Sequence, residues 1–311
     1  MTLPTAKLGR TGFEATRLGF GAMELSGLGS PLTPQQVGGL LHGVLDAGIN
    51  FIDTSPDYGA SEELIGTHLS GRRGEFFLAS KCGCLVGRQP VLRRGRLEHD
   101  FSPANVRAGV EQSLRRMKTD HLDLVQVHSS PSRAVLESHG TLAAMEALRA
   151  EGKVRFLGMS SVLPDLLDHI AMGVFDAFQI PWSALQPEHE DAIRSAARAG
   201  AGTIVRGGVA RGAPAPDHDA ARDHEFWRGF VKERRSLWER ADLDGLLDGM
   251  SRMEFLLRFL LANPDLHTTI IGTSKPEHLA ANVAAARQGP LAPDLCAEAK
   301  RRIGRARGAP R

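Results

Sequence analysis

The sequence has few of the features that mark a specialised protein. Its 311 residues include one tyrosine and three cysteines, too few for a disulfide framework, which predicts a reducing, cytoplasmic environment. Its 36 acidic residues nearly balance its 38 lysines and arginines, so neither nucleic acid nor a membrane surface is expected as a partner. No apolar run has the length of a membrane span, and the first residues do not resemble a signal peptide.

What the sequence does contain is a regular alternation of short apolar runs and longer amphipathic segments. The 42% of hydrophobic residues is typical of a folded globular protein. Because the apolar runs are continuous rather than alternating, they indicate parallel strands buried on both faces. The runs are residues 18–20, 49–53, 76–81, 122–128, 154–159, 175–180, 202–205 and 268–271.

Helices are predicted between these strands from periodicity and capping residues. Thr33 is a suitable N-cap before Pro34, and Ser102 followed by Pro103 opens another helix. The predicted helices are residues 34–46, 61–68, 103–117, 141–150, 163–172, 188–199 and 252–261. Eight strands separated by helices predict an α/β protein with the (β/α)8 TIM-barrel fold, formed by residues 1–311 as a single domain.

An open dinucleotide-binding sheet is rejected as the alternative fold. It would require Gly-x-Gly-x-x-Gly after its first strand, and Gly19-Phe20-Gly21 is not followed by the third glycine. The turn-like residues 9–12, with short apolar stretches on both sides, predict an N-terminal β-hairpin that closes the bottom of the barrel. The basic residues 300–307 are expected to fray in solvent.

Two long loops interrupt the alternation, after the third and seventh strands. Residues 83–99 form the first and residues 207–249 the second. Because each loop follows a strand, both are expected at the C-terminal face of the barrel, as candidate lids over an active site. The arginines of the first loop are interpreted as a solvated face, and the aromatic residues of the second as the apolar side of a helical lid. These residues are Arg88, Arg93, Arg94 and Arg96, and Phe226, Trp227 and Trp238.

Polar residues stand at or just after the ends of several predicted strands. They are Asp53, Lys81, His128, Ser160, Gln179 and Arg206. In a barrel they would encircle one mouth, and Tyr58 would project into it from the loop after Asp53. The Lys81 cation favours a phenolate, Asp53 would keep Lys81 charged, and His128 would hydrogen-bond the same substrate oxygen. Such a group of residues suits proton transfer to a carbonyl oxygen as a hydride arrives.

These residues lie in stretches that jointly resemble the aldo-keto reductase family. The stretches are residues 50–59, 79–81, 113–124 with His128, 152–160 and 271–279. The resemblance implies an enzyme that reversibly reduces a small aldehyde or ketone with NADPH, NADH being the less favoured cofactor. It implies that Tyr58 is the general acid and base, that Lys81 and Asp53 tune it, and that His128 orients the substrate carbonyl.

The resemblance also implies a cofactor held in an extended form across the mouth. Ser160 and Gln179 would bind the carboxamide, with Ser161 where the family usually has asparagine, and Trp182 would stack on the nicotinamide ring. Gly208 and Gly212 would approach the diphosphate. The residues at the adenosine end would be Gly272, Thr273, Ser274, Lys275, His278 and Asn282.

Four positions bear on how the cofactor would be bound. Gly272 and His278 stand where many members have a lysine and an arginine that bind the adenosine 2′-phosphate, which weakens the case for NADPH. Lys275 and the helix that begins near Pro276 offer another phosphate site. Arg206 stands where a small residue is usual, within reach of either a cofactor phosphate or the substrate.

Other functions are compatible with parts of this pattern. The same fold could bind NADP(H) as a regulatory or scaffold protein with little turnover, although an intact set of four catalytic residues disfavours this. A Schiff-base aldolase would use Lys81 as a neutral amine, which Asp53 opposes. No metal site is predicted, because Cys82-Gly83-Cys84 lacks the spacing of common metal motifs. Nothing in the sequence indicates a particular substrate or oligomeric state.

Overall fold

Eight parallel strands close into a barrel in the computed structural model, which describes residues 2–26, 32–87, 92–93, 96–215 and 225–308. The last strand pairs with the first through Thr269 and Leu18, so the sheet has no open edge. The predicted barrel is therefore confirmed. In chain order its strands are β3 (Leu18–Gly21), β4 (Phe51–Asp53), β5 (Phe77–Cys82), β8 (Leu122–Val127), β9 (Val154–Ser160), β10 (Ala177–Pro181), β11 (Gly202–Arg206) and β12 (Thr268–Ile271).

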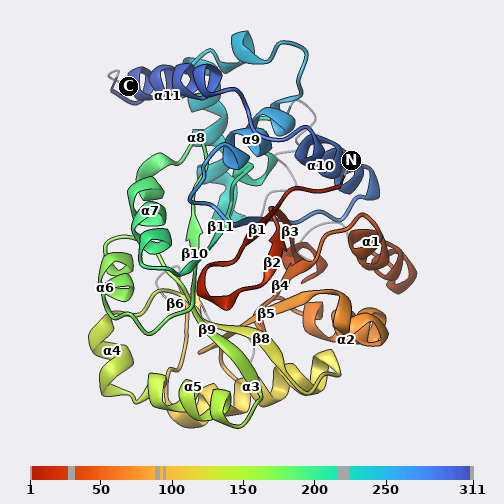
Figure 1. Ribbon diagram of the computed structural model, residues 1–311, viewed down its shortest axis with the longest axis vertical. Helices are drawn as coiled ribbons and strands as arrows, with labels where there is room; N and C mark the ends of the chain where they lie inside the picture. Colours follow the sequence, from red (N-terminus) through yellow and green to blue (C-terminus); the bar gives the residue numbers. More distant parts are fainter. Residues whose placement is uncertain (1, 27–31, 88–91, 94–95, 216–224, 309–311) are drawn as a thin grey trace.

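Helices surround the barrel (Figure 1). The first of them shows why they begin where they do, because Thr33 Oγ1 accepts a hydrogen bond from the Gln36 backbone and Gln36 Oε1 accepts one from the Thr33 backbone. The outer helices are α1 (Pro34–Asp46), α2 (Ser61–Leu69), α3 (Pro103–Met117), α4 (Arg133–Ser138), α5 (Thr141–Ala150), α6 (Asp165–Ala171), α7 (Glu190–Arg198), α9 (Arg252–Leu261) and α10 (Pro276–Arg287). No helix in the described part of the chain is both long and apolar enough to cross a bilayer.

The N-terminal hairpin closes one end of the barrel, as predicted. Strands β1 (Thr5–Lys7) and β2 (Glu14–Thr16) pair antiparallel and lie across the barrel end in Figure 1. Leu8 is fully buried in an inner apolar cluster that includes Phe51 and Phe77, and the Phe13 ring lies 4.8 Å from that of Phe77. Hydrophobic burial therefore plugs this end of the barrel.

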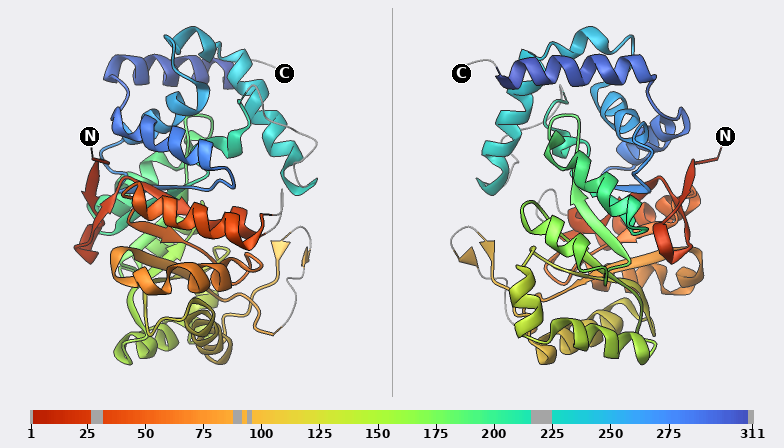
Figure 2. Two further views of the ribbon diagram at one scale, coloured as in Figure 1. Left: turned by 90° about the vertical axis from the view of Figure 1, so that its right-hand side faces the viewer. Right: turned by 60° about the vertical axis from the view of Figure 1, so that its left-hand side comes forward.

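The two predicted insertions project from the opposite end of the barrel (Figure 2, left). The first contains a short antiparallel pair, β6 (Leu92–Arg93) and β7 (Arg96–Leu97), which the sequence analysis did not predict. The second contains α8 (Glu225–Arg240) between the short turns η5 (Ala210–Gly212) and η7 (Leu243–Leu246). Several side chains for which predictions were made lie outside the described residues: Arg88, Arg93, Arg94, Arg96, Phe226 and Trp227.

Trp238 of α8 is fully buried. Its indole N–H donates to Asp244 Oδ1 at 2.9 Å, and its ring contacts Phe255 of α9 edge-on at 5.8 Å between centroids. This ring therefore belongs to the apolar side of a helix, as interpreted from the sequence, and the helix is anchored on the barrel wall.

The expectation of a frayed basic tail was wrong. Residues of this tail belong to α11 (Pro293–Gly308), which packs against α8 and η7. Ile303 is buried, Lys300 pairs with Glu190, and Arg302 pairs with Asp242. The basic residues were misread because the partners that dock the helix, Glu188, Glu190 and Asp242, are distant in sequence.

Candidate active site

A buried ion pair lies at the C-terminal ends of β4 and β5. Lys81 Nζ donates to Asp53 Oδ2 at 2.7 Å and to the Thr54 carbonyl oxygen at 2.8 Å. Both charged side chains are only 1% exposed. Burial disfavours the ammonium, but the charges of Asp53 and Tyr58 outweigh it and raise the pKa of Lys81. The lysine is therefore a fixed cation.

Asp53 is held by two further strands. Its Oδ1 atom accepts hydrogen bonds from the side-chain amides of Gln126 on β8 and Gln179 on β10, each at 2.8 Å. The sequence analysis missed Gln126. A signal was present, because this buried glutamine interrupts an apolar run two residues before His128, at an inward-facing position of the strand.

Tyr58 lies above this pair, in the loop after β4. Lys81 Nζ is 5.0 Å from the centre of the phenol ring. The hydroxyl has no hydrogen-bond partner among the described residues, so it can contact a ligand. Burial raises the pKa of Tyr58, with the Lys81 charge opposing that rise. The hydroxyl thus carries a proton beside a cation that would stabilise its loss.

His128 follows β8, and its ring meets the Tyr58 ring edge-on at 6.4 Å between centroids. Burial lowers the pKa of His128 to about 4, although Asp57 opposes this shift. The predicted four residues, Asp53, Tyr58, Lys81 and His128, are therefore brought together at one mouth of the barrel.

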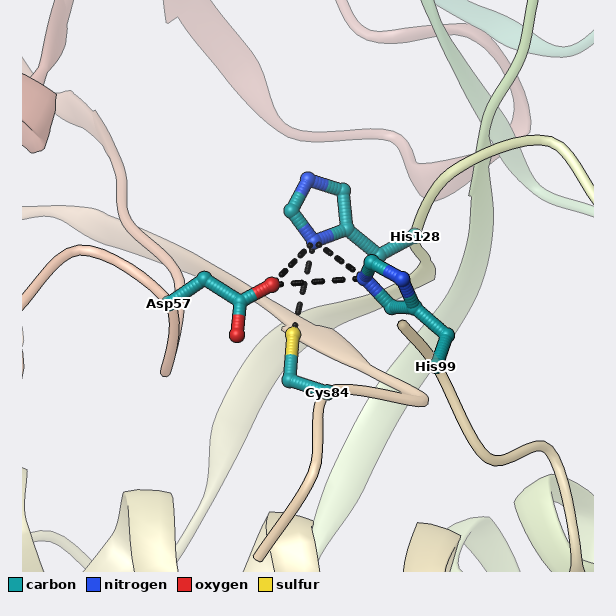
Figure 3. A group of neighbouring side chains, drawn as sticks. All are labelled: Asp57, Cys84, His99 and His128. Atoms are coloured by element: carbon teal, nitrogen blue, oxygen red, sulfur yellow. Dashed lines mark hydrogen bonds and ion pairs between the residues drawn. The ribbon is translucent and has the colours of Figure 1, made fainter. Parts of the chain in front are cut away.

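Three more polar side chains surround His128 Nδ1 (Figure 3). Asp57 Oδ2 lies 3.2 Å away, Cys84 Sγ 3.3 Å and His99 Nε2 3.3 Å. Burial works against the Asp57 carboxylate, but the His128 and His99 rings outweigh it and lower its pKa. Sequence reasoning assigned no role to Asp57, Cys84 or His99, because they lie on separate segments whose paths a single sequence does not reveal.

The residues predicted to hold a carboxamide and a nicotinamide ring separate into two groups. Ser160 Oγ and Gln179 Oε1 lie 3.4 Å apart beside Asp53, at the mouth. The Ser161 hydroxyl is instead bonded to His169 of α6, at 2.8 Å. The structure thus brings only Ser160 and Gln179 to the catalytic group, and a carboxamide contact of Ser161 stays a prediction.

Trp182 also lies apart from the catalytic group. Its ring packs against Phe259 of α9 at 5.6 Å between centroids and lines a cavity of about 210 Å³ next to Lys300 of α11. It is therefore part of the layer between barrel and helices, and its stacking on a nicotinamide ring stays a prediction without support from this position. Its indole Nε1 is buried without a hydrogen-bond partner in the described part of the chain.

Arg206, at the end of β11, is at the mouth. It is partly buried, and the Tyr58 and Asp53 charges act on it, opposing the burial that lowers its pKa. No hydrogen bond or ion pair of its guanidinium is found among the side chains and backbone that the structure describes. A guanidinium in this setting suits an anionic or planar ligand group.

The predicted adenosine-end residues follow β12 and enter α10. This helix begins after Lys275 with no side chain capping its first backbone N–H groups, so its N-terminus offers donors to an anion. Lys275 and His278 are exposed, and Asn282 is one helical turn beyond His278. Gly272, Thr273 and Ser274 form the connection, in which Thr273 Oγ1 accepts from the Lys275 backbone at 3.0 Å. These donors fit a phosphorylated cofactor.

The two glycines after β11 have different explanations. Gly212 has a φ of +73°, which glycine adopts without strain. A Cβ atom at Gly208 would lie 2.3 Å from a Leu260 methyl group, so a larger residue there would have to displace that side chain of α9. A diphosphate contact of either residue stays a prediction.

Comparison with known proteins decides the family. A sequence model described as the aldo/keto reductase family matches residues 17–301. The chain belongs to this family. It is 27% identical over 297 residues to the uncharacterized oxidoreductase YqkF of Bacillus subtilis, covering 90% of each chain. It is 27% identical over 293 residues to the L-galactose dehydrogenase of Arabidopsis thaliana, covering 89% of this chain and 86% of that one.

A solved structure agrees with this assignment. The holo form of an aldo-keto reductase from Bacillus halodurans superposes with a TM-score of 0.76 at 26% identity, covering 98% of this chain and 96% of that one. Membership of the aldo/keto reductase family, together with the oxidoreductase relatives, supports an oxidoreductase that reduces carbonyl groups with a nicotinamide cofactor.

Proposed function

We propose that this aldo/keto reductase reduces an aldehyde or ketone to an alcohol, reversibly, with NADPH as its preferred cofactor and Tyr58 as its proton donor. The observation that carries the proposal is the buried Lys81–Asp53 pair beneath the Tyr58 ring, whose hydroxyl has no partner among the described residues. Donation of the Tyr58 proton leaves a negatively charged phenolate. The buried Lys81 cation beside it stabilises that charge.

Bound NADPH would supply the hydride that adds to the carbonyl carbon. The Tyr58 hydroxyl gives its proton to the carbonyl oxygen, and Lys81 stabilises the resulting negative charge on the phenolate. Asp53 keeps Lys81 charged and in place through its 2.7 Å contact. His128 lies on the edge of the Tyr58 ring and orients the carbonyl oxygen by a hydrogen bond. In the reverse reaction the phenolate takes the alcohol proton.

The cofactor assignment follows from the donors around the mouth. Ser160 and Gln179 are placed to bind a carboxamide, and Arg206 is available to a phosphate or to the substrate. Lys275 and the uncapped start of α10 would bind the 2′-phosphate, which supports the choice of NADPH over NADH. Three unpaired cysteines agree with the reducing cytoplasm, where we place the enzyme.

The test combines binding and turnover. Titration with NADPH and NADH, followed by protein fluorescence, should show tighter binding of NADPH. Steady-state assays should then cover aldehydes, ketones and sugar carbonyls, because one relative is named for L-galactose. The Tyr58→Phe variant should bind cofactor normally and lose about 10²–10⁴-fold in kcat.

An exposed residue that is not among the predicted site residues provides the control. The His139→Ala variant should keep wild-type turnover, since His139 is on the surface after α4. Full activity of the Tyr58→Phe variant would disprove the assigned proton donor. Tight NADPH binding without turnover of any carbonyl would instead favour a regulatory or scaffold role.

A further inference from the structure

Four side chains with metal-ligating atoms meet beside Tyr58, and they point toward one another in Figure 3. Asp57 lies in the loop after β4, Cys84 just after β5, His99 at the end of the first insertion and His128 just after β8. The four ligand atoms all lie within 4.8 Å of one another. Residues separated by up to 71 positions, from 57 to 128, are thus gathered around one small volume.

Four of the six distances between these atoms approximate the edges of a tetrahedron around a metal ion, and the other two, from Cys84 Sγ to Asp57 and to His99, are no longer than 4.8 Å. From His128 Nδ1, the distances are 3.2 Å to Asp57 Oδ2 and 3.3 Å to both Cys84 Sγ and His99 Nε2. Between His99 Nε2 and Asp57 Oδ2 the distance is 3.3 Å. Zinc–ligand bonds of about 2.0–2.3 Å in tetrahedral geometry give edges of roughly 3.3–3.7 Å.

Hydrogen bonds explain only part of this convergence, although Ser129 Oγ and Ser55 Oγ also lie 3.2 Å from His99 Nε2 and 3.6 Å from Cys84 Sγ. Nδ1 of a neutral imidazole has either one proton or one lone pair, yet three polar atoms lie within 3.3 Å of it. The Asp57 side chain is only 8% exposed, and its Oδ2 atom has no hydrogen-bond partner in the described part of the chain, despite two ring nitrogens nearby. Unsatisfied buried polar atoms are uncommon in native proteins, and a bound ion is one explanation for them.

We propose that Asp57, Cys84, His99 and His128 bind one divalent transition-metal ion, of which Zn²⁺ fits the ligand set best. One sulfur, two imidazole nitrogens and one carboxylate oxygen suit zinc, whereas magnesium and calcium prefer oxygen ligands. The thiolate and the carboxylate together balance the charge of the ion. Binding forms one metal–sulfur bond and releases the Cys84 thiol proton to solvent, with no change of oxidation state.

Four protein ligands make a closed site, so the metal has a positioning role and leaves no open position for substrate. It would join the end of the first insertion, through His99, to the catalytic mouth. It would also fix the His128 tautomer, because a ring bound through Nδ1 carries its proton on Nε2, which faces away from the cluster in Figure 3. This second consequence rests on the proposed reductase function, in which Nε2–H donates to the substrate oxygen.

The experiment uses the full chain with any affinity tag removed. Elemental analysis should find about one zinc ion per chain, and competition with a chromophoric chelator should give its affinity. Replacement by Co²⁺ should produce intense visible bands of tetrahedral coordination and a thiolate charge-transfer band. The titration should release about one proton per ion near pH 8, where free imidazoles are neutral.

Variants assign the ligands. The Cys84→Ser variant should lose the charge-transfer band, and the His99→Ala variant should weaken zinc binding by at least about tenfold. The matched controls are Cys296→Ser and His139→Ala, which change the same residue types outside the cluster and should bind zinc like the wild type. Circular dichroism of each variant separates loss of a ligand from loss of folding.

Two results would overturn the site. One is a wild-type protein that binds neither Zn²⁺ nor Co²⁺ in the titration, and the other is undiminished binding in folded Cys84→Ser and His99→Ala variants. These readouts need no turnover, so they are independent of the reductase assignment. Metal binding without carbonyl reduction would disprove only the proposed function, and carbonyl reduction by a protein that binds no metal would disprove only the site.

Discussion

The two ends of the barrel differ in chemistry although the same strands build both. On β4, Phe51 belongs to the apolar plug and Asp53, two residues later, to the catalytic group. On β5, Phe77 and Lys81 are related in the same way, four residues apart. Alternate residues of a strand face the barrel interior. The inward-facing side chains of β4 and β5 therefore change from apolar at one end of the barrel to charged at the other. The apolar end is therefore expected to contribute to stability alone, whereas the charged end is expected to contribute to both stability and chemistry.

The buried ion pair at the charged end carries the largest expected effect, on stability and on activity together. Lys81→Met leaves Asp53 as an uncompensated buried charge and should lower the free energy of unfolding by about 3–5 kcal/mol. It should also reduce kcat by about 10²-fold or more. Denaturant unfolding and steady-state kinetics measure the two losses.

The double variant Asp53→Asn with Lys81→Met is the control for this prediction. It removes both charges, so most of the lost stability should return while activity stays low. If the double variant is as unstable as Lys81→Met, the loss of stability comes from altered side-chain packing rather than from an unpaired buried charge.

At the apolar end, Phe77→Ala should affect stability without affecting chemistry. The Phe77 ring contacts those of Phe13, Phe51 and Phe156, at 4.8, 5.4 and 6.2 Å between centroids. Its truncation should cost about 3–5 kcal/mol. Thermal melting measures the loss, with Phe77→Leu as a milder companion. A changed kcat in the folded variant would contradict the proposed division.

Trp238→Phe tests the anchoring of the second insertion at the catalytic end. The variant loses the 2.9 Å indole bond to Asp244 and weakens the contact of Arg252, whose guanidinium lies 5.6 Å from the indole ring centre. The expected loss is about 1–2 kcal/mol of stability. Backbone amides of α8 should exchange hydrogen faster in this variant, while those of the N-terminal hairpin should not change. A uniform increase in exchange rate across the chain would argue against local anchoring.

The Thr33 capping box offers a smaller and cleaner change. Thr33→Ala removes the oxygen that accepts from the Gln36 backbone at 3.3 Å and should cost about 1 kcal/mol. Thr33→Ser keeps that oxygen and should melt close to the wild type. Equal melting of the Ala and Ser variants would mean that the cap contributes nothing at this end.

The smallest effect concerns pH and α11. Burial opposes ionisation of Glu188, but its own backbone N–H and Arg307 outweigh it and lower its pKa from the ordinary 4.5. A depressed carboxylate pKa stabilises the fold above the ordinary value, and this contribution is lost as pH falls through the folded-state pKa. The melting temperature of the Glu188→Gln variant should therefore fall slightly less steeply than that of the wild type as the pH is lowered below about 4.5. An unchanged curve would remove Glu188 from the docking of α11.

The barrel itself was predictable because its signals are local. Continuous apolar runs gave the eight strands, and Thr33 and Ser102 gave two helix starts that the structure reproduces. The meeting of Asp53, Tyr58, Lys81 and His128 followed because parallel strands end at one face, so residues just after strands meet whatever their separation in sequence.

The remaining features depend on contacts that a single sequence does not contain. The docking of α11 could not be predicted, because it depends on contacts such as that between Arg302 and Asp242, sixty positions away. The position of His99 beside His128 depends on the path of a long insertion. Ser161 and Trp182 were assigned by resemblance, and their actual neighbours, His169 and Phe259, are set by the packing of α6 and α9.

Asp53 accepts hydrogen bonds from Lys81, Gln126 and Gln179, whose side chains come from three other strands of the barrel. Changing either member of the ion pair therefore loosens the framework while it silences the reaction. Tyr58 differs, because its hydroxyl makes no hydrogen bond that the described fold needs. A Tyr58→Phe protein loaded with NADPH is thus the appropriate bait for capturing the natural carbonyl compound from a metabolite extract, since it would hold the molecule in an intact site and leave it unreduced.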